Sequence, residues 1–381
     1  MRIGVITYYN SDDNYGQILQ CFALQKYLEM CGHSVFLIKY APEKKKSFTK
    51  RILDFFYEKE KKKYFFFVKE LFFQKCNYKK NRIRKFDLFK KDNIIATTNV
   101  YRSIDELRLN PPVADVYICG SDQIWNNSLY DDNSAGWFLN FGNVPKRIAY
   151  AASFGRMLNE SEFIILKNYL KEFDFISVRE FSAKKMCESQ NIKDIRVVAD
   201  PTLLLNKSIY FRLMDSNEKK ETMPYVFLYA LNVKNENDIC WNQVYSFAKE
   251  SNLKLKYVNA SGFIAARTVV KRNKPLYLTI PEWLSSLLNS EYVITNSFHG
   301  VVFSVIFHKK FVVIPLKKNM QYGNMRIYDF LKLLNLENRI YDGNSLLQDM
   351  AKSNIDWNDV DHNLHQFIQD SKMFLENALR L

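Results

Sequence analysis

Short apolar runs alternate with helical or polar segments along most of the chain, and this alternation restricts the fold more than any other feature. Residues 2–7 (RIGVIT) are predicted to form a buried strand, residues 17–31 a helix closed by Gly32, and residues 35–38 a second strand. A strand, a helix and a strand in this order form the basic unit of doubly wound α/β domains. We therefore expect an α/β fold.

The same alternation predicts two Rossmann-like domains that face a cleft. In residues 1–205, further strands are expected at 116–119, 147–151, 175–178 and 196–199. A polar stretch at 206–223 is expected to be a linker. It opens a second domain, residues 206–355, with strands expected at 225–230, 254–258, 292–295 and 311–315. Residues 356–381 are predicted to form a helix that packs back on the first domain.

Composition and cysteine spacing indicate a cytoplasmic enzyme. The chain has 381 residues, of which 47% are hydrophobic, and this is enough for a large core. Its six cysteines show no CxxC spacing, so neither a disulfide framework nor a zinc site is predicted. The N-terminal strand lacks the pattern of a signal peptide, and no apolar run reaches the length of a membrane span.

A net charge of +14 by itself suggests a nucleic-acid partner, but the charge is not spread evenly along the chain. Residues 43–92 contain 18 Lys and Arg against 7 Asp and Glu, so this segment contributes +11 and the rest of the chain only +3. Thirteen aromatic residues are interleaved with these charges, which favours amphipathic helices with basic flanks. Three interpretations stay open: a structural insert, peripheral contact with an anionic membrane or lipid-linked substrate, and, least favoured, nucleic-acid binding.

The pentad Asn296-Ser297-Phe298-His299-Gly300 is the strongest candidate for a reaction centre. It follows a predicted strand and precedes the apolar run at 301–307. If that run is helical, the backbone N–H groups around His299 and Gly300 form a positive helix end that can hold a phosphate or carboxylate. The alternative is that Phe298 and His299 simply pack at a strand-to-helix turn.

Other polar residues follow the predicted strands. The turn Asn14-Tyr15-Gly16 lacks the G-x-G-x-x-G fingerprint, so no nicotinamide cofactor is expected. The loop of residues 120–125 (GSDQIW) combines a carboxylate, an amide and an indole, a set that suits a sugar, although an Asp cap beside a core tryptophan is the alternative. Arg179 is placed to bind a phosphate or carboxylate, or to pair with a local acidic residue.

Six segments in order strongly resemble the polysaccharide pyruvyl transferase family. They are residues 14–35 (NYGQILQCFALQKYLEMCGHSV), 117–126 (YICGSDQIWN), 148–155 (IAYAASFG), 176–180 (ISVRE), 197–205 (VVADPTLLL) and 293–307 (VITNSFHGVVFSVIF). The resemblance runs from residue 1 to about 340, except for the basic insert. It implies a fold like that of GT-B glycosyltransferases and transfer of a pyruvyl group from phosphoenolpyruvate to two hydroxyls of one sugar, giving a cyclic ketal. The sugar would belong to a surface polysaccharide or its lipid-linked precursor.

The resemblance also implies roles for the candidate residues. His299 matches the family's histidine directly and Arg179 matches its arginine, so His299 is expected to protonate the donor or hold its phosphate. The residues expected to bind the donor are Arg179, Ser297, His299 and Gly300. Asp122 is expected to be the hydroxyl base, and the residues expected to bind the acceptor are Asn14, Tyr15, Gln123, Trp125 and Ser153. Phosphoenolpyruvate is a substrate, and neither cofactor nor metal is expected.

Two other functions remain as alternatives. A GT-B glycosyltransferase that uses a nucleotide sugar would share the fold, and a helix end would bind its diphosphate. A non-catalytic protein that binds membranes or nucleic acids is suggested by residues 43–92. Against the second alternative, the polar residues at the strand ends are all present.

Overall fold

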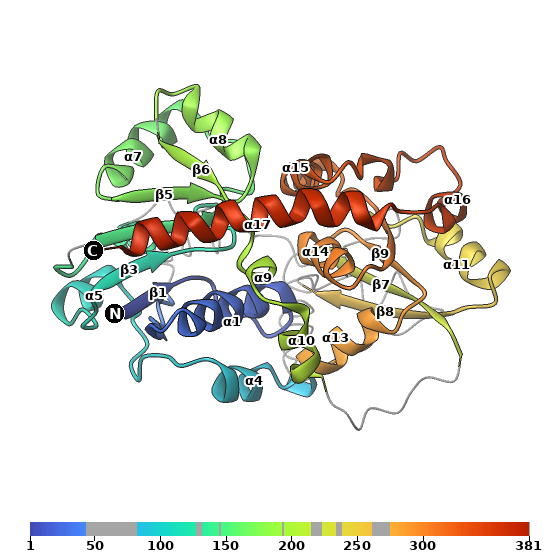
Figure 1. Ribbon diagram of the computed structural model, residues 1–381, viewed down its shortest axis with the longest axis horizontal. Coiled ribbons are helices and arrows are strands. Elements are labelled where there is room, and N and C mark those ends of the chain that lie inside the picture. The colour runs from blue at the N-terminus through green and yellow to red at the C-terminus, as the bar shows by residue number, and fades with distance from the viewer. Residues whose placement is uncertain are drawn as a thin grey trace, which may run out of the picture.

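The N-terminal domain is built on a sheet of parallel strands, as predicted. The computed structural model describes residues 1–42, 82–126, 132–144, 146–192, 194–214, 223–233, 238–260 and 275–380. Within these residues the first sheet has the order β2-β1-β3-β4-β5-β6 (Figure 1). Its strands are β1 (Arg2–Ile6), β2 (Ser34–Leu37), β3 (Val116–Cys119), β4 (Lys146–Ala152), β5 (Phe175–Val178) and β6 (Ile195–Val197).

Helices cover this sheet, and several of them also contact the second domain. They are α1 (Tyr15–Met30), α4 (Phe86–Asn93), α5 (Ile104–Leu109), α6 (Ser134–Trp137), α7 (Glu160–Leu170), α8 (Phe181–Glu188), α9 (Pro201–Leu204) and α10 (Lys207–Leu213). Helix α1 begins where the Asn14 side chain accepts a hydrogen bond from the Gln17 N–H. Most of α1 is buried, because it packs between the sheet and the C-terminal domain.

The C-terminal domain contains a second parallel sheet, with the order β10-β9-β7-β8. Its strands are β7 (Tyr225–Leu231), β8 (Lys254–Ala260), β9 (Tyr292–Thr295) and β10 (Lys310–Val313). The α-helices around it are α11 (Trp241–Glu250), α13 (Ile280–Leu288), α14 (Phe298–Ile306), α15 (Met325–Leu333) and α16 (Leu347–Lys352). This domain also contains the short 3₁₀ turns η3 (Lys318–Asn324) and η4 (Glu337–Arg339), whereas η1 (Arg82–Arg84) precedes α4. All the strands predicted from the sequence are present.

The two domains share one hydrophobic core. Tyr15 of α1 stacks on Trp283 of α13, with 5.2 Å between ring centroids. Arg84 is 1% exposed, and it donates hydrogen bonds to the Tyr15 hydroxyl (2.9 Å) and to the Asn259 carbonyl (2.7 Å). The described end of the basic segment is therefore part of the domain interface, whereas residues 43–81 lie outside the described residues.

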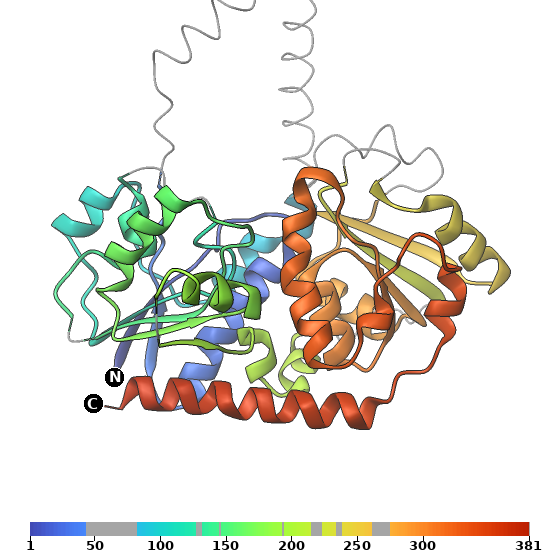
Figure 2. The ribbon, with the colours of Figure 1, turned by 90° about the horizontal axis from the view of Figure 1, so that it is seen from above.

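The last helix, α17 (Trp357–Leu379), runs along both domains (Figures 1 and 2). It begins at Trp357, one residue after the start of the predicted segment 356–381, because the Asp356 side chain caps it. On the N-terminal domain, the Ser371 hydroxyl accepts the backbone N–H of Ala199 (2.8 Å) and donates to the Phe367 carbonyl (2.6 Å). Through this contact α17, which follows the C-terminal domain in the chain, is attached to the N-terminal domain just after β6.

The connection between the domains is helical in its first part. Residues 206–223 are predicted to be a polar linker, but α10 forms over Lys207–Leu213, and residues 215–222 lie outside the described residues. Asn206 caps this helix and Tyr210 is fully buried, with its hydroxyl donating to the Thr202 carbonyl (2.7 Å). The polar composition of the stretch hid Tyr210, the buried side chain that anchors the helix.

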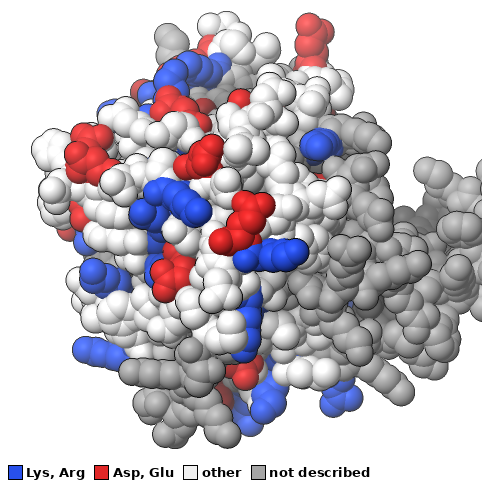
Figure 3. Space-filling view, turned by 90° about the vertical axis from the view of Figure 1, so that its right-hand side faces the viewer, with Lys and Arg blue, Asp and Glu red and all other residues white. Residues whose placement is uncertain are grey.

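One face of the described surface carries mixed charge. On the face at the right of Figure 1, basic and acidic side chains of the described residues are interspersed among uncharged ones (Figure 3). Mixed charge of this kind is typical of an ordinary solvated surface. Most of the excess positive charge of the chain lies in residues 43–92, as the count along the sequence shows.

We expect Ser371→Ala to weaken the attachment of α17. The substitution leaves the buried Ala199 N–H without an acceptor, and this costs about 1–3 kcal/mol. The free energy of unfolding, measured with urea, should fall by that amount. Gln369→Ala, on an exposed position of the same helix, is the control and should change it by less than about 0.5 kcal/mol. Equal stability of the two variants would contradict this role of Ser371.

Candidate active site

Charged side chains gather where the strands of the N-terminal sheet end against the start of α14. Asp122 follows β3, Arg179 and Glu180 follow β5, and Asp200 follows β6. His299 lies in the first turn of α14, directly after β9 of the other domain. Because parallel strands end at one edge of a sheet, residues far apart in the chain are brought together there.

The Asp200 carboxylate lies at the centre of this group. Its Oδ1 accepts hydrogen bonds from the Thr202 N–H (3.0 Å) and hydroxyl (2.7 Å), so the same side chain caps α9. Its Oδ2 lies 2.8 Å from Arg179 Nη1 and 3.4 Å from His299 Nε2. Asp200 therefore connects a cation of the N-terminal domain with the histidine of the C-terminal domain.

These contacts decide the ionisation of Asp200. Burial by itself would raise the pKa of this carboxyl, because the charged form loses its hydration. The attraction of His299 and Arg179 and the hydrogen bonds from Thr202 outweigh burial, and the pKa lies well below its usual value of 3.8. Asp200 is thus ionised at neutral pH and serves as a fixed negative charge.

The pentad around His299 is held by side chains that bind its own backbone and that of β7. Asn296 accepts the Leu231 N–H (2.6 Å) and donates to the Leu231 carbonyl (2.8 Å). Ser297 caps α14 by accepting the Gly300 N–H (3.4 Å), so the helix begins at Phe298, three residues before the predicted run. The predicted strand-to-helix turn is confirmed.

Glycine at position 16 leaves room for the imidazole. A side chain there would place its Cβ 2.1 Å from His299 Nδ1, far closer than atoms can approach. The turn Asn14-Tyr15-Gly16 therefore makes room for His299 of the other domain, and the imidazole packs on the first turn of α1. This is a physical reason for the glycine that the sequence alone does not provide.

Two guanidinium groups approach the ring of Phe298. The Cζ atom of Arg179 is 4.5 Å from the ring centroid and that of Arg326, from α15, is 5.7 Å away. Both lie near Asp122 Oδ1, at 3.6 Å from Arg179 Nη2 and 4.0 Å from Arg326 Nη1. Burial, and then the neighbouring Arg179, lower the pKa of Arg326 to about 10. Nε and Nη2 of Arg179 and Nε of Arg326 are buried without a hydrogen-bond partner.

The residues predicted to bind the acceptor are near this group but differ in exposure. Ser153 is buried and donates to Glu180 Oε1 (2.7 Å), Asn14 caps α1, and Gln123 packs against Gly155. Tyr15 and Trp125 are fully buried, and Trp125 stacks on Phe138. Contact of a sugar with any of these residues stays a prediction.

Three members of the group were not predicted as site residues: Asp200, Glu180 and Arg326. Asp200 stands in the sequence Asp-Pro-Thr after a predicted strand, a position that could have marked it as a polar strand end. Glu180 is the acidic residue directly after Arg179, and the sequence indicates only a local ion pair for it. No sequence pattern indicates Arg326, because it lies on α15 and not directly after a strand. Its side chain reaches the site only through the packing of the two domains.

Comparison with solved structures shows the class of fold. A UDP-N-acetylglucosamine 2-epimerase from Rickettsia bellii has a TM-score of 0.59 at 10% identity, covering 99% of this chain and 95% of that one. The glycotransferase of kitacinnamycin has a TM-score of 0.52 at 10% identity, covering 100% and 99%. The protein has the two-domain GT-B fold, and likeness at this level of identity shows the fold alone.

A family model is more specific than these structures. The model of the polysaccharide pyruvyl transferase family matches residues 14–318, and the chain belongs to this family of enzymes. The resemblance read from the sequence is confirmed. No curated protein sequence matches the chain. None of the helices in the described part of the chain is long and apolar enough to cross a membrane.

We expect Asp200→Asn to destabilise the protein, even though asparagine can still cap α9. The variant leaves the buried Arg179 without its closest counter-ion, and loss of one partner of a buried pair costs about 3–5 kcal/mol. Urea unfolding at neutral pH should show this difference. Asp194→Asn, at an exposed position, is the control and should leave stability unchanged.

The same pair of proteins tests the sign of the pKa shift. A carboxyl whose pKa is lowered by folding stabilises the folded state above its unfolded pKa, and this contribution is lost as the pH falls. The difference between wild type and Asp200→Asn should therefore shrink as the pH drops below about 4. A difference that grows towards low pH would contradict the assignment.

Proposed function

We propose that the protein transfers the pyruvyl group of phosphoenolpyruvate to two hydroxyls of one sugar, forming a cyclic ketal. Family membership supports pyruvyl transfer. The identity of the donor rests on the charges of the site, because phosphoenolpyruvate is a small anion that carries both a carboxylate and a phosphate. Its binding requires cations that still have free hydrogen-bond donors.

The observation that carries this proposal is the pair Arg179 and Arg326. Buried N–H groups normally have partners, so unpartnered ones on two neighbouring guanidiniums need an explanation. A bound anion would supply acceptors for them and would offset the repulsion between the two cations. Asp122 lies beyond hydrogen-bond distance from both, so it does not satisfy them.

His299 is assigned the proton transfer. As the first hydroxyl attacks C2 of the donor, the methylene carbon receives a proton from His299 and becomes the methyl group. The bond from C2 to the phosphate oxygen then breaks, and phosphate leaves with the electron pair. The second hydroxyl attacks C2 and closes the ketal. Each of the two hydroxyls loses its proton. One of these protons makes up for the proton that His299 gave to the methylene carbon, and the other leaves on phosphate. Asp200 is suited to orient the imidazole.

The GT-B fold keeps a nucleotide-sugar glycosyltransferase as the second candidate. The structures that resemble this chain include an epimerase named for a UDP-sugar. Phosphoenolpyruvate and UDP-sugars can be compared directly by their effect on the melting temperature, because a ligand stabilises the folded state that it binds. We expect only phosphoenolpyruvate to raise it.

We expect His299→Ala to lower kcat by about 10²- to 10⁴-fold with little change in KM for phosphoenolpyruvate, because a general acid acts in the transition state. His299→Gln, which can donate a hydrogen bond but no proton at neutral pH, should be equally slow. The assay follows phosphate release with galactose or mannose glycosides as acceptors, and mass spectrometry of the ketal.

Arg179→Lys is the matched comparison, because it keeps the charge but loses the planar fork of donors. It should raise KM for phosphoenolpyruvate more than it lowers kcat. A high KM and unchanged kcat in His299→Ala would make His299 a phosphate ligand instead. Release of a nucleotide from a sugar nucleotide, without consumption of phosphoenolpyruvate, would favour the glycosyltransferase.

We further propose that residues 43–92 bring the enzyme to an anionic membrane surface, where a lipid-linked acceptor would be found. The support is the +11 charge of this segment among its aromatic residues. Attraction of this kind is screened by salt, so flotation with phosphatidylserine vesicles should fall steeply between low and physiological salt. Neutral phosphatidylcholine vesicles are the control, and equal binding to both would identify a structural insert.

A further inference from the structure

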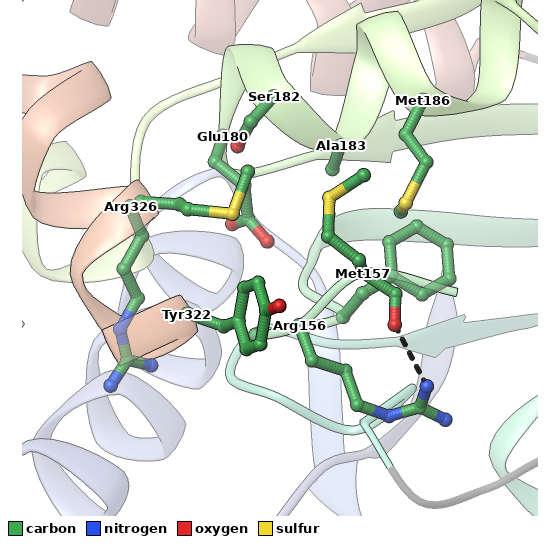
Figure 4. A pocket seen from close by; sticks show the side chains of 11 residues that line it. Arg156, Met157, Glu180, Ser182, Ala183, Met186, Tyr322 and Arg326 are labelled. Carbon is green, nitrogen blue, oxygen red and sulfur yellow. Dashed lines mark hydrogen bonds between the residues drawn. The ribbon is translucent and has the colours of Figure 1, made fainter. Parts of the chain in front are cut away.

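A pocket opens beside the charged group, at the seam between the domains (Figure 4). The space in it that the centre of a water-sized sphere can reach is about 10 Å³, which is room for one hydroxyl group, so a larger ligand would lie at its mouth. One wall comes from the loop after β4 and the start of α8, and the other from η3 and α15. Its lining residues include Phe154, Arg156, Met157, Glu180, Tyr322 and Arg326. Glu180 and Arg326 belong to both places, so the pocket leads directly to the proposed donor site.

The Glu180 carboxylate has one oxygen bound and one free. Its side chain is 5% exposed, and Oε1 accepts the Ser153 hydroxyl (2.7 Å). Oε2 is buried without a hydrogen-bond partner, 4.0 Å from Arg179 Nε. An unsatisfied buried carboxylate oxygen costs free energy, so its retention points to a ligand that donates a hydrogen bond.

The neighbouring helix does not use Glu180 either. Glu180 precedes α8 at the N-cap position, where an acidic side chain often accepts a backbone N–H, but it makes no such bond. Instead the Asp329 carboxylate, reaching across from α15, accepts the Ser182 N–H (2.7 Å). The C-terminal domain thus caps α8 and leaves the Glu180 side chain free to face the pocket.

The rest of the pocket suits an uncharged ligand with an apolar face. Tyr322 is 46% exposed and Met157 is 48% exposed, and both side chains are drawn at the pocket in Figure 4. An exposed aromatic ring is a platform for the C–H face of a sugar ring. Arg156 already has a counter-ion and needs no anionic ligand, because it forms a bidentate ion pair with Glu162 (2.8 and 2.5 Å).

We propose that this pocket receives the attacking hydroxyl of the acceptor, that the sugar ring lies at its mouth on Tyr322, and that Glu180 is the base that removes the proton of this hydroxyl. This inference rests on the proposed pyruvyl transfer. The hydroxyl proton passes to Glu180 Oε2 as the oxygen bonds to C2 of the donor, and phosphate later leaves with its electron pair. Glu180 returns its proton to solvent or to the departing phosphate.

The charges around Glu180 agree with a basic role. Burial raises the pKa of Glu180 above its usual 4.5, and the attraction of Arg179 and Arg326 and the hydrogen bond from Ser153 offset only part of this. Cys187 of α8 also faces the carboxylate, and its own pKa is raised by burial to about 12, so it stays neutral. A base with a raised pKa accepts a proton more readily, provided that the pH keeps it ionised.

We expect Glu180→Gln to lower kcat by about 10²- to 10⁴-fold while the rise in melting temperature caused by phosphoenolpyruvate is kept. In the wild type, kcat should fall as the pH drops through the pKa of Glu180, since the base must be ionised, and this limb should be absent from Glu180→Gln. Glu188→Gln, an exposed position at the end of α8, is the control and should behave like the wild type. Full activity of Glu180→Gln would overturn the assignment.

Tyr322 tests the subsite separately from the base. Tyr322→Ala should raise KM for a galactose or mannose glycoside about tenfold or more, and Tyr322→Phe, which keeps the ring, should not. Tyr328→Ala, exposed on the following helix, controls for loss of a surface tyrosine. Saturation-transfer NMR with methyl galactoside and methyl mannoside measures binding without turnover, and no loss of signal in Tyr322→Ala would overturn the subsite. A wild type that binds the glycoside but consumes no phosphoenolpyruvate would instead refute the pyruvyl-transfer proposal.

Discussion

The contact of one carboxylate with an arginine of its own domain and a histidine of the other is the interaction on which the rest of the site depends. Asp200 lies 2.8 Å from Arg179 of its own domain and 3.4 Å from His299 of the other. Charges buried this deeply are tolerated only when they neutralise one another, because each has lost its hydration. The ion pair therefore requires the two domains to meet here, and the hydrophobic core that they share fixes how they meet. The packing that holds the two domains together is therefore the same packing that brings the site residues together.

In the proposed mechanism the acid and the base lie in different surroundings. His299 donates its proton beside the anion held by Arg179 and Arg326. Glu180 lies near the same guanidiniums, where burial raises its pKa and one of its oxygens has no hydrogen-bond partner. Two titratable groups in different surroundings can thus take opposite roles at one pH.

The sequence was sufficient for the elements but not for every contact between them. Alternation predicted both sheets, and residues at strand ends, such as Arg179 and His299, could be found because parallel strands share an edge. Arg326 could not, since its position depends on how α15 packs across the domain seam. Trp125 looked available for a sugar, because an aromatic residue in a polar loop resembles a binding platform. Its burial depends on Phe138, a partner that no local pattern identifies.

The position of the seam explains why residues from both domains are needed for each substrate. The proposed donor site combines Arg179 with His299 and Arg326, and the proposed acceptor pocket combines Glu180 with Tyr322. Neither domain alone presents a complete set. Contacts such as the Asp329 carboxylate capping α8 hold the walls of the pocket in register, so the oxygen of Glu180 stays 4.0 Å from the guanidinium that faces the donor. In the proposed reaction, that closeness would let a hydroxyl held at Glu180 reach a carbon held at Arg179.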